Sequence, residues 1–249
     1  MTKLPKPPLA DEPDPILHHY IYSWIKKHNP QPGNVDMFNM TPIDKYGHRV
    51  GNNTQGWRSP HNFDCVNWKD AVLVFGCSHV WGQALAYEDS LCAQLERKIN
   101  RPVINLGIMG AGPKFAIETA IQLKNIYGIH LVDRRPKAVI HVWSHYLRRH
   151  YQIDGLNRVR QSHIIDYEPD TPVTLEQLNW EAQLFWDNWK YLWPEPTQQL
   201  NYTFFSDSGK MYNLPVVTQL DWASDNAHYG PLTHAALAEK IATDFLKNT

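Results

Sequence analysis

The chain has 249 residues, which is close to the upper size at which one hydrophobic core keeps growing, so one large domain is expected. Its hydrophobic share of 43% and charged share of 20% are typical of globular proteins and exclude wholesale disorder. A net charge of -1 gives no broad attraction for nucleic acid or for an anionic membrane surface. We therefore expect neither nucleic acid nor a membrane as a partner.

The three cysteines, Cys65, Cys77 and Cys92, are widely spaced and indicate neither a disulfide framework nor a zinc site. The N-terminus is interrupted by prolines and lacks the apolar stretch of an export signal. No apolar run approaches the roughly 20 residues that a membrane-spanning helix needs. We expect a cytoplasmic protein without metal or other cofactor, and the sequence leaves its oligomeric state open.

Residues 1–68 are expected to form an N-terminal region of three parts. A proline-rich arm is followed by an amphipathic docking helix over residues 15–28 and then by an irregular lead-in. Within the lead-in, residues 44–60 could form a hairpin-like loop.

The pattern becomes regular after residue 68. Short apolar runs that predict strands alternate with segments of helical periodicity, and Gly128 marks the end of the second predicted helix. In chain order these are a strand at 71–76, a helix at 90–99, a strand at 102–107, a helix at 114–128 and a strand at 136–143. Two successive strand-helix-strand units predict an α/β domain with a parallel sheet and a ligand crevice at the carboxyl ends of its strands.

Residues 147–215 break this rhythm and are expected to be an insertion in a domain that spans residues 69–249. The insertion begins with basic residues and continues with a Trp-rich helix at 174–193, whose start has the spacing of a capping box. Its aromatic residues either dock the helix on the sheet or stack on a sugar ring. A last amphipathic helix is predicted at 234–247.

Ser78 follows the first predicted strand, at a turn into a helix-compatible segment. A serine there is exposed in the crevice, beside helix N–H groups that favour developing negative charge. A serine hydroxyl needs a base, and Asp225 and His228 lie three positions apart just before the last helix. The spacing allows Asp225 to orient the imidazole of His228 toward Ser78, whereas the alternative role for Ser78 is a helix N-cap.

Three ordered blocks resemble those of the SGNH (GDSL-like) hydrolases. They are FGCSHVWG at 75–82, NLGIMGAGP at 105–113 and DNAH at 225–228. The resemblance implies a flavodoxin-like, three-layer α/β/α sandwich with a central parallel sheet. It also implies a serine esterase that works through an acyl-enzyme.

By the same resemblance, Ser78 is the nucleophile, His228 the base and Asp225 the orienting carboxylate. The backbone N–H groups of Ser78 and Gly110 are the implied oxyanion donors. The substrate is expected to be a small-molecule ester, with an O-acylated carbohydrate as the candidate, and the same residues could transfer the acyl group to a sugar hydroxyl.

The sequence also departs from the family pattern. Cys77 stands where the family usually has aspartate, and the usual Gly-x-Asn-Asp after the third strand is replaced by residues 142–146, VWSHY. Ser144 or His145 could supply the missing side-chain donor. These departures keep open a non-catalytic binding or structural protein on the same scaffold.

Several other histidine and arginine side chains have open roles. His79 is beside Ser78 and either packs or faces the crevice. Arg148 belongs to a basic cluster that is either a solvated surface or, at the end of the third strand, close enough to meet an anionic group of the substrate. His141 and His145 are four positions apart, but a metal site would need a third ligand at a recognisable spacing. We therefore favour packing for His141.

Overall fold

The computed structural model describes residues 53, 57–108, 111–146, 149–153, 158–162, 175–193 and 195–247. The predicted arm, the docking helix and most of the hairpin-like loop lie outside these residues. So does the start of the predicted capping box.

The centre of the fold is a four-stranded sheet in which every pair of neighbouring strands is parallel. The order is β2-β1-β3-β6, with β1 at Val72–Gly76, β2 at Val103–Gly107, β3 at Ala138–Trp143 and β6 at Gln198–Thr203. This order matches the first four positions of the flavodoxin-like 2-1-3-4-5 arrangement. The parallel sheet predicted from the alternating elements is confirmed.

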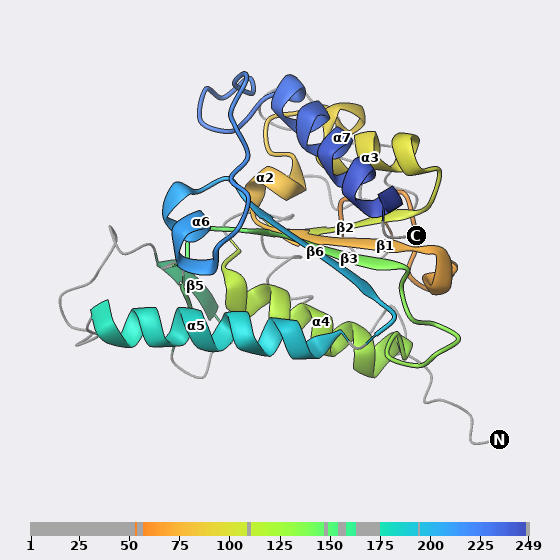
Figure 1. The fold of residues 1–249 in the computed structure, drawn as a ribbon, viewed down its shortest axis with the longest axis horizontal. Helices are drawn as coiled ribbons and strands as arrows, with labels where there is room; N and C mark the ends of the chain where they lie inside the picture. The colour runs from red at the N-terminus through yellow and green to blue at the C-terminus, as the bar shows by residue number, and fades with distance from the viewer. Residues whose placement is uncertain are drawn as a thin grey trace.

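Helices cover both faces of the sheet (Figure 1). On one face lie α4 (Pro113–Tyr127) and α5 (Leu175–Leu192), and on the other lie α3 (Leu91–Ile99) and α7 (Pro231–Lys247). The strands alternate their side chains between these two layers: Leu73 and Phe75 belong to the first core, and Val72 and Val74 to the second. The three-layer α/β/α sandwich is therefore confirmed.

The predicted helix boundaries follow from local signals. Ser90 caps α3 by accepting a hydrogen bond from Ala93 N at 3.4 Å, and Asn100 ends it in the left-handed conformation. Pro113 is at the first turn of α4, and Gly128, with φ of 64°, ends that helix. Because these signals are adjacent to the helices in sequence, the predictions fell within a few residues of the observed ends.

The start of α7 was predicted three residues too late, at His234 rather than Pro231. The additional turn is capped by Asp221, ten residues earlier in the chain. Its Oδ2 accepts a hydrogen bond from Leu232 N, and its Oδ1 accepts one from Thr233 N, both at 2.9 Å. Pro231 at the first helical position is a local start signal that the prediction passed over, whereas a cap supplied from a separate loop leaves none in the helix sequence.

The described part of the lead-in packs into the main core. Trp57, Phe63 and Trp68 are each at most 5% exposed. The Phe63 and Trp68 rings lie 5.7 and 5.3 Å from that of Tyr127 in α4. Next come two short 3-10 helices, η1 (Trp68–Asp70) and η2 (Tyr87–Asp89), on either side of β1.

The segment at 147–215 contains both predicted and unexpected elements. The Trp-rich helix is confirmed as α5, and Trp189 and Trp193 pack on Phe75 of the sheet, whereas Trp180 is 64% exposed. Before it, β4 (Arg149–Ile153) and β5 (Arg158–Ser162) form a separate antiparallel pair. After it, β6 joins the central sheet and leads into α6 (Ser206–Tyr212).

β6 was missed because its sequence, QQLNYT, is polar and its first four residues are only half-buried. Such a strand lacks the apolar run that identified β1, β2 and β3. Among the described residues, no helix has the length and apolar character that crossing a membrane requires.

Candidate functional site

The short helix α2 (Ser78–Trp81) follows β1 and lies directly on the carboxyl ends of two strands. A Cβ on Gly76 would overlap the Val80 side chain, and one on Gly107 would lie 2.5 Å from Trp81 N. Both strands end in glycine at the point where α2 crosses them, so the absence of side chains allows this close approach. Ser78 is thereby held at the edge of the sheet where parallel α/β folds place ligands.

Asn105, a residue that the sequence analysis did not single out, links α2 to β2. Its Nδ2 donates to Val80 O at 3.1 Å, and its Oδ1 accepts from Gly107 N at 2.9 Å. The side chain is fully buried. A polar residue within an otherwise apolar strand is the signal that could have identified it, because a buried amide is expected to be hydrogen-bonded.

The loop that carries Asp225 and His228 reaches the same edge of the sheet because the chain before it runs parallel to the end of β6. Val217 N donates to Thr203 O at 2.8 Å, and Val216 forms a parallel bridge with Thr203, beside the end of β6. The position corresponds to the fifth strand of the flavodoxin-like order. A chain that pairs there in parallel leaves the sheet at its carboxyl edge, next to α2.

Residues 221–230 then form a closed loop. Trp222 and Tyr229 form an antiparallel bridge, and Ala223 N donates to His228 O at 2.8 Å. Asn226, at the tip, has a φ of 53°, a left-handed conformation that asparagine tolerates better than most residues. The loop therefore presents Asp225 and His228 from either side of a tight turn.

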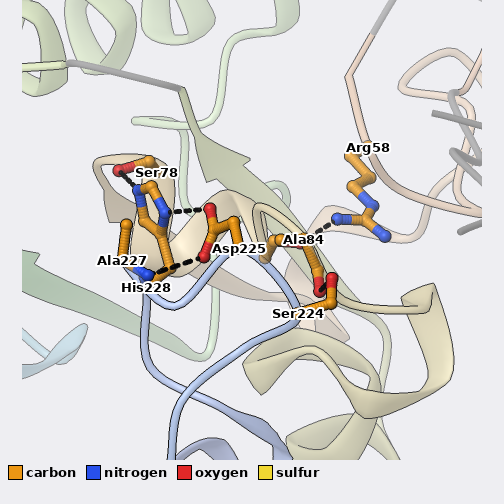
Figure 2. Close-up of polar contacts among 8 residues, drawn as sticks. Arg58, Ser78, Ala84, Ser224, Asp225, Ala227 and His228 are labelled. Carbon is orange, nitrogen blue, oxygen red and sulfur yellow. Dashed lines mark hydrogen bonds and ion pairs between the residues drawn. The ribbon is translucent and has the colours of Figure 1, made fainter. Parts of the chain in front are cut away.

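Ser78, His228 and Asp225 form a continuous hydrogen-bonded chain (Figure 2). The distance from His228 Nε2 to Ser78 Oγ is 2.9 Å, and that from His228 Nδ1 to Asp225 Oδ2 is 2.7 Å. Asp225 Oδ1 also accepts hydrogen bonds from Ala227 N and His228 N, each at 3.0 Å. The structure brings together the three side chains that sequence reasoning singled out.

The surroundings of Asp225 favour its charged form. Burial acts to raise its pKa, but the hydrogen bonds from Ala227 N, His228 N and the His228 ring outweigh burial and hold the pKa below its ordinary value. The Asp225 side chain is 6% exposed and that of His228 is 18% exposed. An ionised carboxylate in such a site keeps the proton of His228 on Nδ1 and leaves Nε2 able to accept one.

The alternative role of Ser78 as an N-cap does not hold. Cys77 occupies the N-cap position with extended backbone angles, and Ser78 is the first residue of the helix. The Ser78 side chain is directed at His228 (Figure 2).

His79 packs within an aromatic group next to the hydrogen-bonded chain of Ser78, His228 and Asp225. It is 9% exposed, and its ring centroid lies 4.8 Å from Phe204, 4.7 Å from Tyr229 and 5.0 Å from His228. These contacts place His79 behind His228, where it limits the positions that the imidazole can take.

Ser144 and His145, the candidates for the missing donor, lie against α6. Ser208 Oγ donates to Ser144 O at 3.0 Å, and His145 Nε2 is 3.9 Å from Asp207 Oδ2. Both residues directly follow β3, at the same sheet edge as Ser78. The other two candidates, Gly110 and Arg148, are outside the described residues.

His141 belongs to the core. Its ring lies 4.1 Å from that of Trp143 and 4.4 Å from that of Trp189, so it packs under α5. His145 instead stacks on Tyr146. In the described part of the chain, no three His, Cys, Asp or Glu side chains are grouped so that they could hold a metal ion.

No protein-family model and no curated protein matches the chain. Solved structures to which it is similar include a carbohydrate acetylesterase family member from Sinorhizobium meliloti, with 12% identity over 72% of this chain and 98% of that one and a TM-score of 0.45. They also include the acetyl xylan esterase Est2A from Butyrivibrio proteoclasticus, with 12% identity over 72% of this chain and 63% of that one and a TM-score of 0.46.

A protein of the G-D-S-L family from Desulfitobacterium hafniense DCB-2 has 14% identity over 70% of this chain and 98% of that one, with a TM-score of 0.38. That family is the group which the sequence blocks resemble. The fold of this chain follows from its own strand order, and the site follows from its own contacts. Together they define an α/β protein with a Ser-His-Asp arrangement at the carboxyl edge of its sheet.

Proposed function

We propose that this protein is a serine esterase that hydrolyses its substrate through an acyl-enzyme. The observation that carries the proposal is the hydrogen-bonded chain from Asp225 through His228 to Ser78, with a distance of 2.9 Å between His228 Nε2 and Ser78 Oγ. That distance is within the range that proton transfer from a nucleophile to a general base requires.

In the proposed reaction, Ser78 Oγ attacks the ester carbonyl carbon while its proton passes to His228 Nε2. The tetrahedral intermediate collapses as His228 returns the proton to the leaving alcohol, which leaves an ester on Ser78. Water then attacks this acyl-enzyme, with His228 again taking the proton, and a carboxylic acid leaves. Asp225 stays ionised throughout and stabilises the imidazolium that forms in each half of the cycle.

The developing oxyanion would be stabilised by backbone and side-chain donors. As the first residue of α2, Ser78 has an N–H that no carbonyl of that helix can accept, so it is available to an oxyanion. Gly110, from the family resemblance, would provide the second N–H. Ser144 or His145 would replace the asparagine donor.

The proposed substrate class is a small-molecule ester, and an O-acylated carbohydrate is the candidate. Aromatic side chains on the site side of the molecule support it: Tyr229 follows His228 directly, and Trp222, which pairs with Tyr229, is 53% exposed. Exposed aromatic faces of this kind stack on apolar ring faces of substrates. Arg148 would face an anionic group if the substrate carries one.

The proposal is tested by measuring hydrolysis of a short-chain aryl ester and of an acetylated sugar by the wild type and by Ser78→Ala. We expect the wild type to release the alcohol and Ser78→Ala to lose at least about 10³-fold in kcat. Equal rates for the two proteins would overturn the proposal. A folded wild type with no turnover would favour the binding protein that Cys77 and the missing asparagine leave open.

A further inference from the structure

The segment that follows the proposed nucleophile has an unfavourable backbone. After α2, Gly82 has a φ of 82° and Ala84 a φ of 61°. The first value suits glycine, but the second is a left-handed conformation that an alanine rarely adopts. A conformation of this kind persists only where the surroundings hold it in place.

Arg58, from the lead-in, holds one side of this segment. Its guanidinium donates from Nη1 to Trp81 O at 3.0 Å and to Gly82 O, and from Nη2 to Leu85 O at 2.7 Å. The residue is 1% exposed, and its guanidinium lies 4.5 Å from the centroid of the Trp81 ring. One buried cation therefore binds both the end of α2 and the end of the loop at 82–85.

Ser224 holds the other side. Its Oγ donates to Ala84 O at 3.0 Å (Figure 2). Ala84, Leu85 and Ala223 form a small buried apolar cluster. Ser224 immediately precedes Asp225 in the chain. The loop at 82–85 thus has one set of contacts with Arg58 and another with the segment that carries the acid and the base.

We propose that Arg58 and Ser224 are positioning residues, which set the separation of Ser78 and His228 through the loop at 82–85. The inference rests on the proposed function of the triad. Its physical reason is the small size of α2, since a helix of four residues is oriented by what fixes its ends. Arg58 fixes the end of α2 that lies opposite Ser78. Ser224 holds the loop at 82–85 against the segment that carries Asp225.

Four variants test the inference. Arg58→Lys keeps the charge but loses the fork that serves three carbonyls. Ser224→Ala loses the hydroxyl, and Ser224→Thr restores it at an exposed position. Arg134→Lys is the matched control, because Arg134 Nη1 donates to Tyr127 O at 3.1 Å at the far end of α4. The readouts are kcat and KM for an aryl ester, the rate of Ser78 labelling by a fluorophosphonate, and Tm.

We expect Arg58→Lys to lower both kcat and the labelling rate by about 10- to 100-fold with little change in KM, since misplacement of a reacting group by about 1 Å has this effect. Ser224→Ala should lose about three- to tenfold, as for one hydrogen bond, and Ser224→Thr should recover that loss. Arg134→Lys should label at the wild-type rate.

Two results would separate this inference from the proposed function. In the first, the wild type takes the label at Ser78, Ser224→Ala is labelled at the same rate as the wild type, and Arg58→Lys has a lower Tm but an unchanged labelling rate. The two residues then support folding alone, and the inference is wrong. If the wild type takes no label, the proposed function fails, and the inference fails with it.

Discussion

Asp225 accepts three hydrogen bonds, and two of them come from backbone N–H groups of its own loop. The carboxylate therefore has two separable tasks. One oxygen shapes the turn that presents His228, and the other fixes the tautomer of the imidazole. A substitution that keeps the shape of the side chain should remove mainly the second task.

We predict that Asp225→Asn folds normally and lowers kcat by about 10³- to 10⁴-fold, because a neutral amide favours the wrong imidazole tautomer. The measurement is steady-state hydrolysis of an aryl ester, with Tm as the check on folding. Asp187→Asn is the control, since Asp187 pairs with Lys190 on α5 and is 45% exposed. A loss below about tenfold would mean that His228 does not depend on Asp225 for its orientation.

At the scale of elements, the loop at 221–230 is fixed by Asp221 as well as by its own pairing. Burial acts to raise the pKa of Asp221, but the N–H groups of Leu232 and Thr233 and the Thr233 hydroxyl hold that pKa below its ordinary value. A depressed pKa means that the charged form stabilises the fold. This stabilisation is present above the unfolded pKa and is lost as the pH falls through the folded one.

Asp221→Ala should therefore lower the unfolding free energy by about 0.5–2 kcal/mol at neutral pH, the usual cost of losing a helix cap. Urea unfolding measures the change, and the difference from wild type should shrink as the pH is lowered below the ordinary range of aspartate. Asp133→Ala, at an exposed position in the turn after α4, should have little effect. An equal loss at acid and neutral pH would contradict the role of the charge.

The elements that could be predicted from the sequence are those whose signals lie within the element or directly beside it. β1, β2 and β3 were recognised because they are short and mostly apolar, and α3 and α4 because their own ends carry Ser90, Pro113 and Gly128. The polar edge strand β6 was missed because it lacks an apolar run.

In the site, Ser78, Asp225 and His228 were singled out because a serine after a strand and an Asp-His pair before the last helix are residue types that suit acyl transfer, and the structure brings the three side chains together. The role of Arg58 could not be predicted from the sequence, since its three carbonyl partners lie more than twenty positions away along the chain. Nothing near Arg58 in the sequence distinguishes it from a solvated arginine. Contacts between segments far apart in sequence become visible only in the folded structure.

On the scale of the whole molecule, two buried histidines make the fold sensitive to acid. Burial lowers the pKa of His141 to about 3 and that of His234 to about 3, with the Arg58 cation adding to the effect at His234. Neutral His234 Nδ1 accepts a hydrogen bond from Leu91 N at 2.9 Å, which protonation would abolish. Below about pH 6.5 the unfolded chain takes up protons that the folded protein does not, so stability falls as the pH decreases.

We predict that the unfolding free energy decreases between about pH 7.5 and about pH 5 by on the order of 1 kcal/mol per pH unit for each of these histidines. His141→Phe should flatten the dependence, because the ring remains among Trp143 and Trp189 without a titrating group. His130→Gln, at an exposed position, should leave the slope unchanged. A slope for His141→Phe equal to that of wild type would show that His141 titrates normally in the folded state.

The most direct test of the proposed catalytic triad is the mass of the intact protein after treatment with a fluorophosphonate, followed by mapping of the modified peptide. The arrangement of Ser78, His228 and Asp225 predicts a single added phosphonyl group on Ser78, and no addition to His228→Gln over the same time. A folded wild type that takes no label, or takes it at a serine other than Ser78, would contradict the account.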